Sequence, residues 1–101
     1  MPELPVACAL TAEALRARQQ GLLATLLRDA DTYDLTADGV RLRFHAESDT
    51  LEAITRAVDA ERACCRFLRF SITVEPDGGP MTLELTGPPG TRDFLASLLV
   101  L

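Results

Sequence analysis

Two adjacent cysteines, Cys64 and Cys65, lie in the stretch ERACCRFLRF, which covers residues 61–70. The only other cysteine of the chain is Cys8, far away in sequence. Thiolate sulfur binds zinc and softer ions, and it is also the nucleophile of thiol redox chemistry. A protonated cysteine can instead pack as a small apolar group. The cysteines therefore indicate a metal site, a redox pair or core packing.

The helix predicted to carry the pair turns its side chains by about 100° per residue. Cys65 shares a face with apolar residues of that helix, and we expect this face to meet the core: Leu51, Ile54 and Val58. Cys64 points about 100° to the side, toward three small residues: Ala53, Ala57 and Ala60. Glu61 lies three and four residues before the cysteines and projects between them. Two thiols and a carboxylate thus gather over the last turn, where a relaxed disulfide between neighbouring helical residues is disfavoured.

Cys8 precedes the first predicted helix, whose N-terminus would favour a thiolate. A short arm that folds back over the second helix would bring Cys8 to the pair; otherwise Cys8 is an incidental terminal residue. Three converging thiolates would select a soft or borderline ion, namely Zn(II), Cu(I), Hg(II) or As(III). Zinc would take a fourth ligand, most simply Glu61 or water.

His45, the single histidine, is predicted to end a strand on the side of Arg41 and Arg43, away from the helices. We therefore expect a solvated strand end rather than a ligand. Three arginines surround the cysteine pair: Arg62, Arg66 and Arg69. They would favour thiolates, or they would cover apolar surface and pair with Asp59 or Glu75.

Hydrophobic periodicity predicts the elements that must position these residues. A first helix begins at Thr11 and runs through Gly21 to about Arg28. Alternation around Tyr33–Thr36 and Val40–His45, separated by an ADG turn, predicts a hairpin. The second helix is expected to start with a capping box between Asp49 and Glu52 and to end near Cys65 or Arg66.

A second hairpin follows, with strands RFSITVE and MTLELT around the turn PDGGP. Its first strand is expected to bury Phe70, Ile72 and Val74. A short helix with Phe94 and Leu95 closes the chain, and the apolar stretch Leu98–Leu101 must dock on its own domain or on a second copy, which allows a homodimer.

The predicted order is α-ββ-α-ββ-α, and the outward strand positions are polar, so only one face of the sheet is covered. The fold class is therefore α+β: residues 1–101 form a single two-layer domain, a four-stranded antiparallel sheet with helices packed on one face.

Composition excludes several functions. A net charge of −5 without a basic, aromatic-rich cluster argues against nucleic acid as a partner. No apolar run is long enough to cross a bilayer, and the N-terminus does not resemble a secretory signal, so a cytoplasmic location is expected. Thiols stay reduced there, and three cysteines are an odd number, which disfavours a disulfide scaffold. We find no phosphate loop, nucleophile arrangement or thioredoxin-like CxxC, so we do not expect an enzyme.

Along nearly its whole length, the chain resembles a group of small uncharacterised bacterial proteins that are loosely associated with heavy-metal handling. The resemblance rests on an N-terminal Cys followed by LT, a DG turn, ERxCCxF, EPDGGP, LxTGPxG and a closing FL. In this chain the motifs are Cys8, Leu10 and Thr11; Asp38 and Gly39; Glu61, Arg62, Cys64, Cys65 and Phe67; Glu75–Pro80; Leu85–Pro88 and Gly90; and Phe94 and Leu95. The resemblance implies that Cys8 belongs with the cysteine pair.

Together these observations predict a cytoplasmic metal- or metalloid-binding protein that uses Cys8, Cys64 and Cys65, with Glu61 as a fourth or supporting ligand. Its role would be sequestration, delivery or sensing. The first alternative is a thiol redox protein, in which Cys64 attacks and Cys8 or Cys65 resolves. The second is a structural or partner-binding module whose cysteines only pack.

Overall fold

The computed structural model describes residues 21–99. Within this range the elements are α2 (Leu22–Asp29), β1 (Thr32–Leu35), β2 (Gly39–Phe44), α3 (Thr50–Cys64), β3 (Arg69–Val74), β4 (Met81–Thr86) and α4 (Thr91–Leu99). The order α-ββ-α-ββ-α and the α+β class are confirmed.

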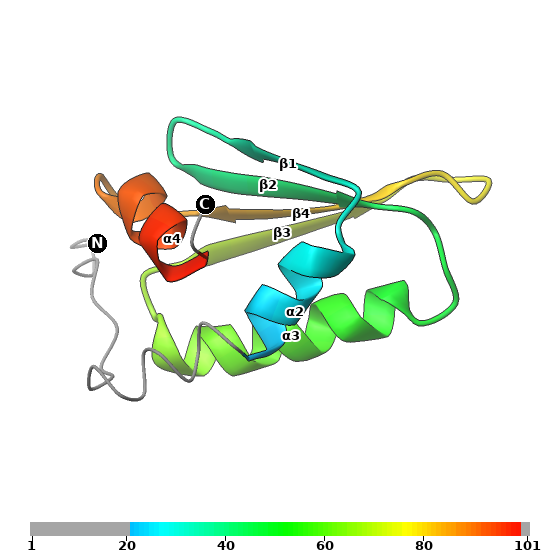
Figure 1. Ribbon diagram of the computed structural model, residues 1–101, viewed down its shortest axis with the longest axis horizontal. Coiled ribbons are helices and arrows are strands. Elements are labelled where there is room, and N and C mark those ends of the chain that lie inside the picture. The colour runs from blue at the N-terminus through cyan, green and yellow to red at the C-terminus, as the bar shows by residue number, and fades with distance from the viewer. Residues whose placement is uncertain (1–20, 100–101) are drawn as a thin grey trace.

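The four strands form one antiparallel sheet in the order β1-β2-β4-β3. The helices cover one face of this sheet, with α2 beside α3 and α4 at one end (Figure 1). The two hairpins meet along β2 and β4, where Val40 lies opposite Leu85 and Leu42 opposite Leu83. The architecture therefore has two layers, as predicted.

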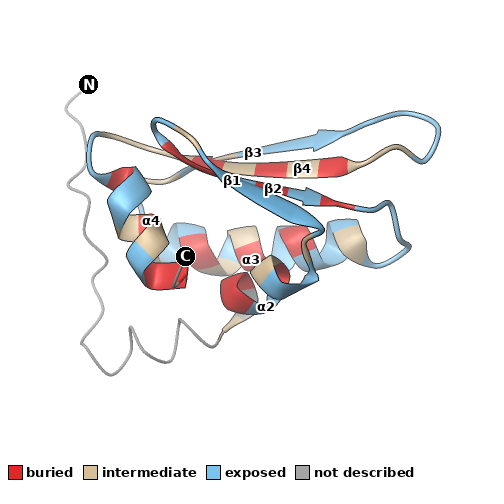
Figure 2. Ribbon diagram, turned by 45° about the horizontal axis from the view of Figure 1, so that its top comes forward, coloured by how far each residue is buried: buried red, intermediate tan, exposed pale blue. Residues whose placement is uncertain are grey.

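The core lies between the two central strands and the helices (Figure 2). Alternate residues of β2 and β4 are buried: Val40, Leu42, Phe44, Met81, Leu83 and Leu85. The helices contribute Leu23, Leu26, Ile54, Ala57, Leu95, Leu98 and Leu99. Leu98 and Leu99 thus dock on their own domain, while Val100 and Leu101 lie outside the described residues.

The two edge strands are covered less than predicted. Ile72 and Val74 of β3 are 37% and 55% exposed, although alternation assigned them to the buried face. On the opposite edge, Tyr33 and Leu35 of β1 are 49% and 40% exposed. The cause is the strand order, which places β2 and β4 over the helices and leaves β1 and β3 at the margins.

The first helix differs from the prediction at Gly21. This residue has extended backbone angles, φ −89° and ψ −155°, and forms the N-cap of α2, so a helix continuing through Gly21 is wrong. Glycine loses more conformational freedom than other residues in a helix, which makes it a favourable place for a helix to begin. The part of the predicted helix from Thr11 to Gln20 lies outside the described residues.

The capping box predicted for the second helix is also wrong. Asp49 is the N-cap of α3, but its side chain makes no capping hydrogen bond. The Glu52 carboxylate instead pairs with Arg56, with Nη2 2.7 Å from Oε1. The Thr50 amide is satisfied by the carbonyl oxygen of Glu47 at 3.2 Å, so a local turn takes over part of the capping role.

Candidate functional site

Helix α3 ends at the cysteine pair. The Cys65 amide donates the last helical hydrogen bond to the carbonyl oxygen of Glu61 at 2.7 Å, and Cys65 then leaves the helical conformation with φ −114° and ψ 76°. The Leu68 amide donates to the carbonyl oxygen of Cys65 at 3.1 Å, which turns the chain toward β3. Cys65 is only 1% exposed, so its predicted orientation toward the core is confirmed.

The buried face of α3 is rotated relative to the prediction. Its fully buried residues before the cysteine pair are Ile54, Ala57 and Glu61. Leu51, which was assigned to this face, is 42% exposed, and Val58 is only half-buried. Ala57, one of the three small residues toward which Cys64 was predicted to point, belongs to the core.

Glu61 is the unexpected member of this face. Its side chain is 1% exposed, on the same side of the helix as Cys65 and one turn before it. Burying a carboxylate is costly unless its charge is compensated, whereas leucine would fill such a position at lower cost. The sequence predicted that Glu61 projects between the two cysteines, but it did not predict that the side chain is buried.

The other two predicted sulfur ligands cannot be positioned from the described part of the chain. Cys64 is the last residue of α3, but its side chain is not among those that the structure describes, so its predicted direction stays a prediction. Cys8 lies outside the described residues. Among the described side chains, no group of three or more histidine, cysteine or acidic residues is arranged to hold a metal ion. Glu61 and Cys65 are both buried at the end of α3, where a backbone hydrogen bond joins them.

The segment after the cysteines is held tightly by the start of α4. The rings of Phe67 and Phe94 pack edge to face, with centroids 5.2 Å apart and planes at 82°. A Cβ atom at Gly87 would lie 3.2 Å from the Phe67 carbonyl oxygen and 2.5 Å from Thr91 Oγ1, so this close approach requires glycine. The buried Thr91 hydroxyl donates to the carbonyl oxygen of Pro88 at 2.6 Å.

Several motifs of the sequence therefore meet at one end of the molecule. The segments around ERxCCxF, LxTGPxG and the closing FL contact one another there. The DG turn joins them through a hydrogen bond from the Gly87 amide to the Asp38 carbonyl oxygen, 3.2 Å long. The PDGGP turn lies at the opposite end (Figure 1). This convergence fixes the end of α3, and with it the backbone of Cys64 and Cys65.

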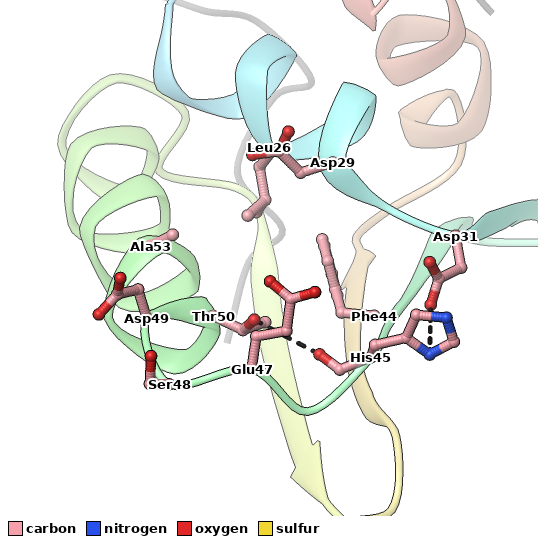
Figure 3. Close-up of a pocket in the computed structure, with 10 residues that line it drawn as sticks. All are labelled: Leu26, Asp29, Asp31, Phe44, His45, Glu47, Ser48, Asp49, Thr50 and Ala53. Atoms are coloured by element: carbon pink, nitrogen blue, oxygen red, sulfur yellow. Dashed lines mark hydrogen bonds and ion pairs between the residues drawn. The ribbon is translucent and has the colours of Figure 1, made fainter.

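His45 is remote from the cysteines. It lies just before α3 begins, whereas Cys65 lies where this 15-residue helix ends, about 22 Å away along the axis at 1.5 Å per residue. Its Nδ1 atom is 3.0 Å from Asp31 Oδ2, and its side chain is 80% exposed (Figure 3). His45 lies directly after β2, and the predicted exposure of its side chain to solvent is confirmed.

Of the nearby arginines, Arg62 pairs with Asp59, with Nε 3.0 Å from Oδ1. Both side chains are more than two-thirds exposed, so this pair contributes little to stability. The pair agrees with the predicted alternative in which Arg62 pairs with Asp59, rather than with the one in which it favours thiolates.

An acidic hollow that was not predicted from the sequence lies at the other end of α3 (Figure 3). Its volume is about 430 Å³, and Leu26, Phe44 and Ala53 are among its walls. Four acidic residues surround it, from the end of α2 and from the two connections that flank the first hairpin: Asp29, Asp31, Glu47 and Asp49. The sequence signal that could have indicated this hollow is the presence of acidic residues on both sides of the first hairpin. That these two connections adjoin in space depends on the fold and is not evident from spacing.

No family model, curated protein or solved structure matches this chain. No helix in the described part of the chain is both long and apolar enough to cross a membrane.

Proposed function

We propose that this protein binds a soft or borderline metal or metalloid ion through Cys8, Cys64 and Cys65. Glu61 would be the fourth ligand or would support one of the thiolates. The ions that suit such a donor set are Zn(II), Cu(I), Hg(II) and As(III). The role would be sequestration, delivery or sensing, in the cytoplasm, rather than catalysis.

The observation that supports this proposal most strongly is the burial of Glu61 and Cys65 together. Both are 1% exposed, and residues four apart on a helix have neighbouring side chains. A cation bound there would have a carboxylate oxygen and a cysteine sulfur from one side of α3 as donors. A packing role alone would favour an apolar side chain at position 61, whereas Cys65 could also pack as a small apolar group.

The position of the pair on its helix favours a metal site over the redox alternative. The carbonyl end of a helix carries partial negative charge, which attracts a cation and disfavours an isolated thiolate. Reactive cysteines are typically found at the opposite, amide end, where the helix stabilises the anion. Cys64 and Cys65 lie at the carbonyl end of α3. The burial of Cys65 further restricts its access to an oxidised partner.

The first test is the metal content of the freshly isolated full chain, purified under reducing conditions without chelators. We expect near-stoichiometric metal by elemental analysis. Thiol titration should then show cysteines that are protected until the metal is removed by a strong chelator, because coordinated thiolates react slowly. Fully reactive thiols in metal-free protein that also fails to take up Zn(II) or Hg(II) would contradict the proposal.

The same samples separate the alternatives. A metal-free protein in which a mild oxidant links Cys8 to Cys64 or Cys65, detected by mass spectrometry, would support the redox reading. Unchanged fold and ion content after replacement of all three cysteines by serine would leave only a packing role.

A further inference from the structure

Strand β3 forms one edge of the sheet, and its outer side is not paired with any described strand. Five of its six residues are exposed, and Phe70 is half-buried. The register with β4 runs from Arg69 to Val74 without interruption, so no bulge bends the edge away. The strand contains no proline, and its one charged residue, Arg69, stands at its first position rather than in its middle.

The other edge is shorter and more protected. Strand β1 has four residues, and Asp34 places a charge in its middle. An exposed edge of six residues with unpaired backbone groups and apolar side chains is a template for another strand. The asymmetry points to β3 as the edge that another chain would use.

The backbone of β3 determines which residues can bond across this edge. The Glu75 amide donates to the carbonyl oxygen of Pro80 at 3.3 Å, so Glu75 directs its backbone groups inward, toward the strand that pairs with β3. Backbone groups of successive strand residues point to alternate sides. Phe70, Ile72 and Val74 therefore direct their amide and carbonyl groups to the outer edge.

We infer that β3 pairs antiparallel with β3 of a second copy of this chain, with Ile72 opposite Ile72. Phe70 then lies opposite Val74, and all three apolar residues meet on the helix-covered face. On the other face Arg69 lies opposite Glu75 of the second copy, and the two-fold axis repeats this ion pair. The pairing joins the two sheets into one continuous sheet.

Self-complementarity identifies the partner as a second copy. A shift of the register by one residue would place apolar residues opposite polar ones. A shift of the symmetry centre to Ser71 would place Arg69 opposite Thr73 and leave the charges unpaired. Only the register centred on Ile72 satisfies the outward hydrogen bonds, aligns the apolar residues and pairs Arg69 with Glu75. This interface is separate from the proposed metal ligands and does not rest on the proposed function.

The test is a charge exchange followed by light scattering on the full chain across a range of concentrations. Wild-type protein is expected to reach the mass of two chains. Arg69→Glu and Glu75→Arg should each remain at the mass of one chain, because like charges then face each other twice. Mixing the two variants should restore the mass of two chains, since both cross-strand pairs become opposite in charge in the mixed complex.

Two further variants locate the interface. Arg43→Glu introduces the same charge change on the same polar face, but on β2, and should leave the dimer intact. Ile72→Pro removes an outward amide without removing a hydrogen bond to β4, so it should give a folded protein with the mass of one chain. A wild-type protein that stays at the mass of one chain, a mixture of the charge variants that fails to associate, or dissociation by Arg43→Glu would overturn the inference.

Discussion

Cys64→Ser is expected to weaken the binding of Zn(II) or Hg(II) by at least about a hundredfold. A serine hydroxyl stays protonated at neutral pH and is a poor ligand for soft ions, so the site would lose one of three strong donors. The backbone of Cys64 is held by α3 and by the contacts beyond it, and serine can occupy the same helical position. The loss should therefore appear in affinity rather than in fold.

Competition against a chromophoric chelator would measure this affinity. Ala63→Ser is the matched control, because it adds the same hydroxyl at the preceding, exposed residue of α3. Circular dichroism would verify that both variants are folded. Glu61→Gln should show a smaller loss, about tenfold to a hundredfold, if the carboxylate binds or orients a ligand. Equal affinities for Cys64→Ser and Ala63→Ser would contradict the assignment of Cys64.

Gly39→Ala is expected to have the largest effect on stability, about 3 kcal/mol or more. Gly39 begins β2 opposite Thr86 and is buried. A Cβ atom there would lie 1.8 Å from the carbonyl oxygen of Leu85 and 2.8 Å from its carbonyl carbon. These are backbone atoms of the neighbouring central strand, so no side-chain rotation relieves the overlap. The two central strands would have to separate where the core is fully buried.

Urea denaturation would measure the loss. Gly78→Ala is the matched control, because a Cβ there meets nothing within 4 Å and only the positive φ of 69° opposes it. That strain costs about 1 kcal/mol. If Gly39→Ala were as stable as Gly78→Ala, the described packing of β2 against β4 would be wrong.

The elements of this fold could be predicted well because each hairpin shows a period-two pattern bounded by turn residues. Burial could be predicted only for the strands that became central. Ile72 and Val74 follow the same alternation as Leu83 and Leu85, yet they remain exposed. The difference arises from the pairing of β2 with β4, which is a long-range choice that local periodicity does not specify.

The candidate site shows the same division. The direction of Cys65 follows from the rotation of about 100° per residue along a helix, and its burial confirms it. Glu61 is buried on this face of α3 while Leu51 is exposed. This could not be predicted, because hydrophobicity alone favours leucine over glutamate in the core. The acidic hollow depends on two connections that only the folded sheet brings together.

X-ray absorption spectroscopy of the Zn(II)-loaded full chain tests the central claim most directly, because it identifies the atoms bound to the metal. The proposal predicts three sulfur neighbours at about 2.3 Å and one oxygen neighbour at about 2.0–2.2 Å. A shell of only oxygen and nitrogen neighbours, or one with a single sulfur, would contradict a site built from Cys8, Cys64 and Cys65.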